Sequence, residues 1–208
     1  TAIDLKQKGF DVVAVGRRKS DNGFFRENGI EYFSVDLNSK EDFKKLPTDY
    51  IDAIIHFAGA MPAHMIGYDA KVYLDSIILG TYNILEYAKI VKAERIIFSQ
   101  SIADVGYLFG STKPVPEDSI MKFPKTGDHA VYSIAKNCAV NLIEHYSAEY
   151  GIKPFILRLP TIYAYHPNSW YYVDGKKKKL GYRLLMEKAM KGEPIEIWGN
   201  PKNVKELV

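Results

Sequence analysis

The sequence predicts an α/β fold built on a doubly wound parallel sheet, and two observations support this. Short, continuous apolar runs recur along the chain, as is typical of parallel strands that are covered on both faces; they lie at residues 12–15, 53–55, 95–98 and 155–157. Longer segments with helical periodicity separate some of these runs, roughly Tyr68 to Lys92 and Asp128 to Tyr150. The alternation of strand and helix indicates a layered sheet.

The N-terminal part of the chain fits this alternation with one gap. Residues 1–8 have the pattern of a helix, Glu31 to Val35 predicts a short strand, and a small helix is expected to begin near Asn38 or Ser39. This architecture usually places a central strand and a glycine-rich turn before its first helix, and these residues contain neither. Two apolar strand edges would then be unpaired. We therefore expect a longer native polypeptide, with this sheet lacking its first strand and its C-terminal part.

Two segments interrupt the alternation and are expected to be irregular. Ile102 to Thr126 contains three prolines with several glycines and charges, and Ala164 to Gly175 is similar. Both follow strands, and the loops at the carboxyl ends of parallel strands build the ligand crevice. The adjacent basic cluster, Lys176 to Lys179, is interpreted as a solvated loop; the alternative is a nearby substrate that carries a phosphate.

Composition excludes several classes of function. The net charge of +3, from 28 basic and 25 acidic residues, gives little reason to expect a nucleic-acid partner. We also expect no membrane association, because no apolar run has the length of a membrane span. A single cysteine, Cys138, favours a reducing compartment such as the cytoplasm. The five histidines lack the paired spacing of a metal site, so no metal is expected.

A candidate proton-transfer site combines Tyr132 and Lys136, one helical turn apart, with Ser101 at the end of an apolar run. The reference pKa of tyrosine is about 10, so a catalytic phenol needs a nearby cation to favour its phenolate. Lowering that pKa by roughly three units takes about 4 kcal/mol. A unit charge at close range supplies an energy of that order when the effective dielectric is about 20. Lys136 could therefore activate Tyr132.

The spacing of this pair is not specific, because Tyr172 and Lys176 repeat it. Context separates the two pairs. Around Tyr132 apolar residues recur with helical period, so Tyr132 and Lys136 share one helix face; around Tyr172 no such pattern exists. The alternative interpretation of the first pair is a half-buried tyrosine with a solvated lysine beside it.

Seven short motifs follow one another along nearly the whole chain. They are Val35-Asp36-Leu37, Ile55-His56-Phe57-Ala58-Gly59-Ala60, Leu79-Gly80-Thr81-Tyr82-Asn83, Phe98-Ser99-Gln100-Ser101, Tyr132 with Lys136, Leu157-Arg158-Leu159-Pro160-Thr161 and Ile195-Glu196-Ile197-Trp198-Gly199-Asn200. In this order and spacing they resemble the extended short-chain dehydrogenase/reductase superfamily, which includes the NAD(P)-dependent sugar epimerases and dehydratases.

The resemblance implies a Rossmann-like fold, with a dinucleotide-binding domain at residues 1–160 and the start of a substrate-binding part at 161–208. It implies that Tyr132 exchanges a proton with a substrate oxygen, that Lys136 lowers the Tyr132 pKa and holds a ribose, and that Ser101 hydrogen-bonds the same oxygen. The cofactor-binding residues would be Arg17, Asp36, Leu37, Phe57, Ala58, Gly59, Ser99, Tyr132, Lys136 and Pro160. The substrate-binding residues would be Ser101, Tyr132, Thr161 and Lys205. The two long helices resemble those that pair in family homodimers.

The cofactor is expected to be NAD or NADP. The second strand ends in Gly16-Arg17-Arg18, where NAD-preferring members carry an acidic residue. Arg17 suits a 2′-phosphate and favours NADP; the alternative is two solvated arginines. The glycine-rich phosphate loop does not occur in these residues.

On the substrate side the chain departs from the family pattern. Relatives carry an asparagine at each of two substrate-side positions, where this sequence has Ile77, next to Ser76, and Thr161. The loss of both asparagines weakens recognition of a UDP-sugar. Ile102-Ala103 replaces the Asp-Glu pair of 4,6-dehydratases, so dehydration is disfavoured, and Lys205 replaces an arginine that grips a phosphate.

The leading interpretation is an NAD(P)-dependent epimerase or oxidoreductase that acts on a sugar attached to a nucleotide. One alternative is an NADP-dependent reductase of a non-nucleotide carbonyl compound, which Arg17 and the lost asparagines favour. The other is a dinucleotide sensor without turnover. Retention of Ser101, Tyr132 and Lys136 argues against a sensor, which has no need of a proton relay.

Overall fold

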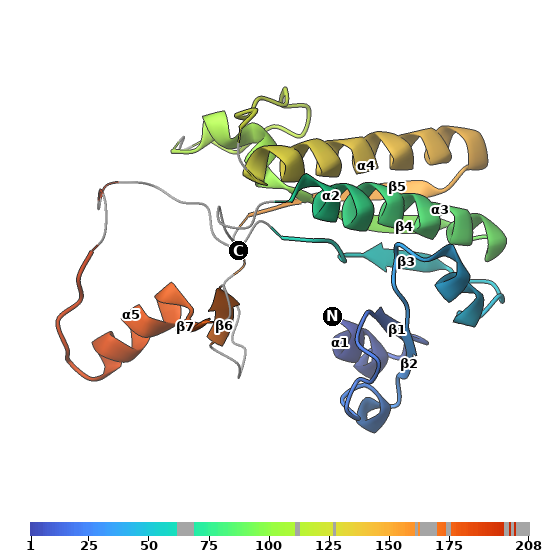
Figure 1. The fold of residues 1–208 in the computed structure, drawn as a ribbon, viewed down its shortest axis with the longest axis horizontal. Helices are drawn as coiled ribbons and strands as arrows, with labels where there is room; N and C mark the ends of the chain where they lie inside the picture. The colour runs from blue at the N-terminus through green and yellow to red at the C-terminus, as the bar shows by residue number, and fades with distance from the viewer. Residues whose placement is uncertain are drawn as a thin grey trace.

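The computed structural model describes residues 1–61, 69–110, 113–126, 128–160, 162, 170–173, 176–197, 200 and 202. Thr161 and Lys205 lie outside these residues, as do Trp198 and Gly199 of the last motif. Within the described part, Figure 1 shows an α/β arrangement in which helices pack on parallel strands.

The predicted parallel strands are confirmed. β1 (Val13–Gly16) pairs in parallel with β2 (Glu31–Ser34). β3 (Ala53–His56), β4 (Arg95–Ser101) and β5 (Lys153–Leu159) form a second parallel sheet in the order β3-β4-β5. Since all three strands of this sheet run the same way, their carboxyl ends lie at one edge.

Among the described residues no strand joins β1 to β3, so the parallel strands β1 to β5 form two separate sheets. Apolar side chains of the two sheets are accessible: Val13 and Val15 are 40% and 46% exposed, and Ile55 is 38% exposed. The sequence predicted that two strands would each have an unpaired edge within these residues, and the described strands agree with this.

The helices before β4 follow the predicted positions. α1 spans Ala2–Gln7, and short 3-10 turns span Arg26–Asn28 and Lys40–Lys45. The Lys40–Lys45 turn begins after Ser39, whose hydroxyl accepts a hydrogen bond from the Asp42 amide at 3.3 Å. The long predicted helix is not uniform: α2 (Ala70–Tyr73) continues through one π-helical stretch (Leu74–Leu79) into α3 (Gly80–Ile90).

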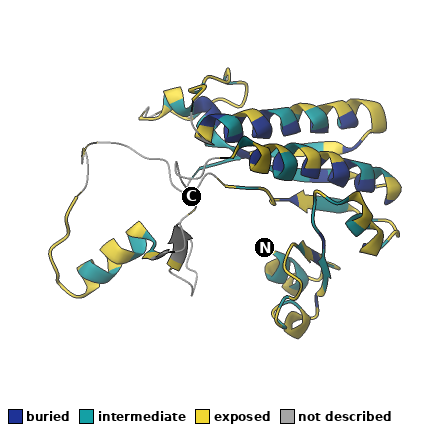
Figure 2. Cartoon of the chain, in the orientation of Figure 1, coloured by how far each residue is buried: buried dark blue, intermediate teal, exposed yellow. Residues whose placement is uncertain are grey.

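The core lies between α3, α4 and one face of the β3-β4-β5 sheet (Figures 1 and 2). α4 spans Asp128–Tyr150, the range that the periodicity predicted. Its residues Ala135, Ala139 and Ile143 are fully buried against Ile96 and Phe98 of β4, among others. Burial of each large apolar side chain contributes about 1.5–3 kcal/mol, which fixes α4 on the sheet.

The segment after β5 differs from the prediction. Instead of a loop, the described residues form a hairpin of β6 (Trp170–Val173) and β7 (Lys176–Lys179), followed by α5 (Gly181–Met190). Aromatic and β-branched residues favour β6. The ammonium of Lys179 lies 5.1 Å from the Trp170 ring centroid and also pairs with Glu187 of α5, which explains how a lysine run becomes an ordered strand.

The segment after β4 also contains more structure than expected, since a 3-10 helix spans Ile102–Leu108. It begins where the Ser101 hydroxyl accepts a hydrogen bond from the Ala103 amide at 3.1 Å. No helix in the described part of the chain is long and apolar enough to cross a membrane.

Candidate active site

The structure brings the predicted catalytic residues together at the carboxyl end of β4. Ser101 is the last residue of β4, and Tyr132 and Lys136 lie in the first three turns of α4, which packs on that strand. Both α4 side chains are buried, with 6% of Tyr132 and 3% of Lys136 exposed. The alternative interpretation, in which the lysine is solvated, is therefore wrong.

Lys136 is held by the strand beneath it. Its ammonium donates to the Ser99 carbonyl at 2.7 Å and lies 3.3 Å from the Ser99 hydroxyl. It also lies 4.5 Å from the Phe98 ring centroid, within the range of a cation–π contact. Burial disfavours the charged amine and lowers the pKa of Lys136 to about 8, so it remains largely protonated at neutral pH.

Tyr132 lies beside this cation, with the Lys136 ammonium 5.8 Å from its ring centroid. The sequence predicted that Lys136 lowers the pKa of Tyr132, but the structure gives the opposite direction. Burial raises the pKa of Tyr132, and a hydrogen bond with Ser101 only partly opposes this. The physical reason is that the low-polarity surroundings penalise the phenolate, while Lys136 directs its ammonium at the Ser99 carbonyl.

The Tyr132 hydroxyl also contacts a residue that the sequence did not single out. It donates to the Met61 sulfur at 3.7 Å. Met61 follows β3 and is 69% exposed, so its flexible side chain covers the phenol from the solvent side. No periodic or motif signal marks such a contact.

The predicted cofactor-binding residues after β3 lie near this edge. Phe57, Ala58 and Gly59 are exposed directly after the end of β3, which pairs with β4 through His56 and Phe98. A Cβ atom on Gly59 would lie 3.1 Å from the buried Ile77, so the glycine lets this backbone approach the helical segment closely.

The predicted adenine contact after β2 is anchored to the same helical segment. The Leu37 carbonyl accepts a hydrogen bond from the Asn83 side chain at 2.7 Å, and Gly80 allows Leu37 to pack closely. The Asp36 carboxylate accepts the Asn38 amide at 3.0 Å and remains partly accessible. Pro160 is partly buried just after β5.

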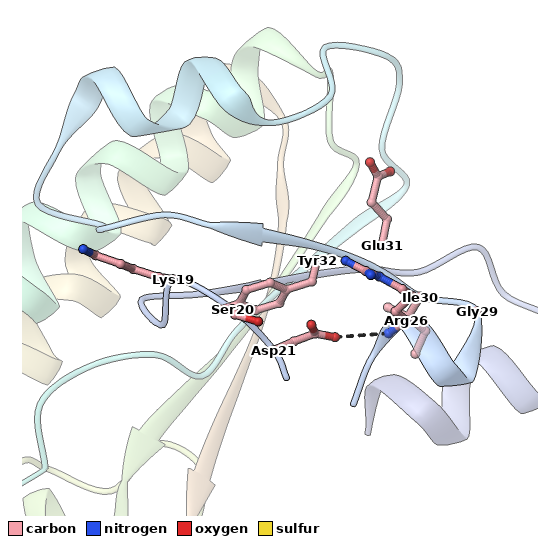
Figure 3. Close-up of a pocket in the computed structure, with 8 residues that line it drawn as sticks. All are labelled: Lys19, Ser20, Asp21, Arg26, Gly29, Ile30, Glu31 and Tyr32. Atoms are coloured by element: carbon pink, nitrogen blue, oxygen red, sulfur yellow. Dashed lines mark hydrogen bonds between the residues drawn. The ribbon is translucent and has the colours of Figure 1, made fainter. Parts of the chain in front are cut away.

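Arg17 is exposed at the end of β1. Beyond it, the Tyr32 hydroxyl donates to the Arg18 carbonyl at 2.8 Å. A polar cavity of about 520 Å³ opens beside β2, and Figure 3 shows its lining, in which Asp21 accepts the Arg26 amide at 3.1 Å. This cavity contains none of the predicted site residues. It is lined by Lys19, Ser20, Asp21, Arg26, Gly29, Ile30, Glu31 and Tyr32.

Several polar residues close to the site are buried in the core. His56 is 2% exposed, and its Nε2 lies 3.0 Å from the Thr81 hydroxyl. Burial, together with the charge of Lys136, lowers the pKa of His56 to about 3, which keeps it neutral. Gln100 and Asn137 are also buried and are hydrogen-bonded to each other at 2.9 Å. Within the described residues, no group of three or more His, Cys, Asp or Glu side chains could hold a metal ion.

The described residues fit a nicotinamide dinucleotide. The exposed residues Phe57 to Gly59 and the Lys136 ammonium beside Ser99 lie at the carboxyl edge of the β3-β4-β5 sheet, where Gly59 lets the backbone pass close to Ile77. This edge is where dinucleotides bind to sheets of this architecture.

Comparison with known proteins agrees with this arrangement. A putative UDP-glucose 4-epimerase of Methanocaldococcus jannaschii is 22% identical over 98% of this chain. A bifunctional UDP-glucose 4-epimerase and UDP-xylose 4-epimerase of Pisum sativum is 27% identical over 56% of the chain and 35% of its own length. This chain spans 63% of the length of the first of these relatives.

Solved structures share the fold. The UDP-glucose 4-epimerase of Thermotoga maritima with UDP-glucose gives a TM-score of 0.73 at 19% identity, over 99% of this chain and 63% of that one. The Thermus thermophilus UDP-glucose 4-epimerase in complex with NAD gives 0.66 at 22% identity, over 92% of this chain and 58% of that one. At the level of the family, residues 2–208 match the NAD dependent epimerase/dehydratase family, to which this chain therefore belongs.

Proposed function

We propose that the protein is an NAD-dependent epimerase or oxidoreductase that acts on a nucleotide sugar, with Ser101, Tyr132 and Lys136 as its catalytic residues. One observation carries this proposal: a buried phenol, a buried ammonium and a hydroxyl converge at the carboxyl end of β4, where the Lys136 ammonium donates to the Ser99 carbonyl at 2.7 Å. A buried amine at such a point is costly without a role.

In the proposed reaction the Tyr132 hydroxyl transfers the proton. As the phenolate, Tyr132 takes a proton from a substrate hydroxyl while the carbon that bears this oxygen loses hydride, and as the phenol it returns the proton when hydride comes back. Ser101 hydrogen-bonds the same oxygen, and the Lys136 ammonium stabilises the phenolate. When bound, NAD would accept and return the hydride, and its oxidised ring would add a positive charge near the phenol. That charge would help to offset the effect of burial on the Tyr132 pKa.

We propose NAD rather than NADP as the cofactor. The family is NAD-dependent, and the Thermus thermophilus relative was solved with NAD. The expectation of NADP depended on Arg17 alone. Arg17 is exposed at the end of β1, and neither comparison favours NADP. Michaelis constants for the two cofactors would decide: a lower value for NADP would restore the earlier expectation.

A nucleotide sugar is proposed as the substrate because the relatives named above are UDP-sugar epimerases. The lack of an acidic pair after Ser101 speaks against dehydration. One observation favours a second candidate, reduction of a non-nucleotide carbonyl compound. Ile77, at the position of a family asparagine, is fully buried and offers no polar group, while the neighbouring Ser76 hydroxyl already accepts the Ala60 amide at 3.1 Å.

A substrate panel separates the two candidates. Calorimetric titration with NAD, NADP, UDP-glucose and UDP-galactose, followed by turnover measurements with the same compounds, is expected to give NAD binding and interconversion of the two sugars. Binding of nucleotide sugars without turnover, or turnover of simple carbonyl compounds only, would contradict the leading proposal.

We also propose that residues 1–160 form a dinucleotide-binding domain and that the substrate-binding part begins at residue 161.

We further propose that the protein is a cytoplasmic homodimer whose two chains pair through α3 and α4. Both helices keep large apolar side chains accessible, among them Tyr82 at 40% and Ile134 at 44% exposure. Light scattering at high concentration is expected to give twice the mass of one chain; a monomer mass would refute the dimer.

A further inference from the structure

An amide pair joins β4 to α4 inside the protein. The Gln100 side chain donates from Nε2 to the Asn137 Oδ1 at 2.9 Å. Gln100 is 4% and Asn137 is 8% exposed, and both lie at the level of the catalytic residues. Buried amides need partners, since an unpaired one loses its hydrogen bonds to water without replacement.

Each end of this pair is attached to the backbone beside a catalytic residue. The Gln100 Oε1 accepts the backbone amide of Ser101 at 2.9 Å. The Asn137 Nδ2 donates to the carbonyl of Ser133 at 2.7 Å. Since Ser133 follows Tyr132 and Asn137 follows Lys136, the pair forms a continuous connection from the Ser101 backbone to the α4 turn that carries both residues.

Apolar contacts alone would hold α4 on the sheet but would fix its position less strictly. Van der Waals contacts between aliphatic side chains tolerate small slides along the helix axis, whereas hydrogen bonds weaken steeply with distance and angle. The Gln100–Asn137 bond crosses from β4 to α4, while the other two bonds fix each amide to its own element, so a shift of α4 relative to Ser101 would break a buried hydrogen bond that water cannot replace.

We propose that Gln100 and Asn137 are positioning residues for the catalytic group. They set the position of the Ser101 hydroxyl relative to Tyr132 and Lys136, and they act through the backbone of Ser101 and of Ser133. This inference deepens the proposed function and depends on it for its catalytic consequence.

The test uses a pair of shape-conserving substitutions in the purified protein. Gln100→Met and Asn137→Leu each remove one amide and leave the other buried without its partner, so each single variant is expected to lose stability. The double variant removes both buried amides at once and is expected to recover part of the melting temperature, because the Ser101 N–H and the Ser133 carbonyl still lose these partners. Its kcat is nevertheless expected to stay about 10- to 100-fold below wild type, since small misplacements of catalytic groups have effects of this size. KM and NAD affinity should change less than about twofold.

A role in stability alone gives a different pattern. In that case kcat would return to the wild-type value together with the melting temperature, and this result would overturn the proposal. Asn141→Leu is the matched control. Asn141 lies one turn further along α4, and its side chain bonds the Asn137 carbonyl at 2.8 Å and, among the described residues, no catalytic residue, so this variant is expected to keep the wild-type kcat.

A second measurement does not need turnover. The Tyr132 pKa can be followed by NMR of ¹³C-labelled tyrosine, with Tyr132→Phe to assign the resonance. Because Ser101 hydrogen-bonds Tyr132, a displaced Ser101 is expected to raise that pKa in the double variant. An unchanged pKa would refute the positioning role. A wild-type protein that turns over no nucleotide sugar would refute the proposed function instead, and the NMR result would still decide on Gln100 and Asn137.

Discussion

At the scale of single residues, Lys136 combines a charge with almost complete burial. Its ammonium has one short hydrogen bond, to the Ser99 carbonyl, and an aromatic face at Phe98. These contacts do not restore all that is lost from water, which is why its pKa falls to about 8. The same burial raises the pKa of Tyr132. The site therefore holds its phenol protonated and its amine charged at neutral pH.

This burial has a measurable effect on stability. The unfolded-state pKa of Lys136 is near the reference of 10.5 and the folded one is about 8, so the unfolded chain binds more protons between these values. Wild-type stability should then rise with pH across this window. The difference corresponds to about 3 kcal/mol, since one pKa unit equals about 1.4 kcal/mol. Lys136→Met lacks this dependence.

Urea unfolding of both proteins at about pH 7 and about pH 10.5 measures the effect. The stability of Lys136→Met relative to wild type is expected to decrease by up to about 3 kcal/mol at the higher pH. Titration of residues that do not contact Lys136 cancels in this comparison. A relative stability that is the same at both pH values would show that burial does not shift the Lys136 pKa.

At the scale of elements, the 3-10 helix at Ile102–Leu108 is tied to β5 by a buried ion pair. The Asp104 carboxylate is 1% exposed and accepts from Arg158 Nε at 3.1 Å. Arg158 also donates to the Glu117 carbonyl at 2.6 Å, so it holds two parts of the segment that follows Ser101. Burial raises the pKa of Asp104, and Arg158 opposes this rise.

Removing one partner of this pair should therefore be costly. Arg158→Met would leave a buried carboxylate unpaired and is expected to lower the unfolding free energy by about 3 kcal/mol. Adding Asp104→Leu to that variant should recover most of the loss, because no buried charge then remains. Denaturant titrations of the two variants measure this. If the double variant were as unstable as the single one, the loss would come from packing.

The sequence allowed most elements to be predicted, for reasons that the structure makes clear. α4 and the core strands have a strong apolar pattern, because burial on a sheet requires it. The π-helical stretch at Leu74–Leu79 left no signal, since one inserted residue hardly changes that pattern. β7 was missed because a run of lysines has neither apolar alternation nor strand propensity, and its contacts with Trp170 and Glu187 are tertiary.

At the scale of the whole molecule, the site depends on three distant segments that meet at one sheet edge. Residues 57–59 and 98–101 could be grouped from the sequence, because the carboxyl ends of neighbouring parallel strands lie at one edge of the sheet, and the family resemblance added Tyr132 and Lys136 of α4 to them. The Gln100–Asn137 pair could not be foreseen, since amide side chains carry no periodic signature. The direction of the Tyr132 pKa was also beyond sequence reasoning, because it depends on how deeply the phenol is buried.

The central claim is that Tyr132 transfers the proton, and turnover of the Tyr132→Phe variant with the sugar substrate tests it most directly. We expect kcat to fall by at least about 100-fold, which is the usual contribution of a positioned proton donor, while NAD binding changes less than about twofold. Tyr172→Phe is the matched control, because Tyr172 has a lysine at the same spacing but lies in β6, and it should keep wild-type turnover. Unchanged turnover in Tyr132→Phe would contradict the account.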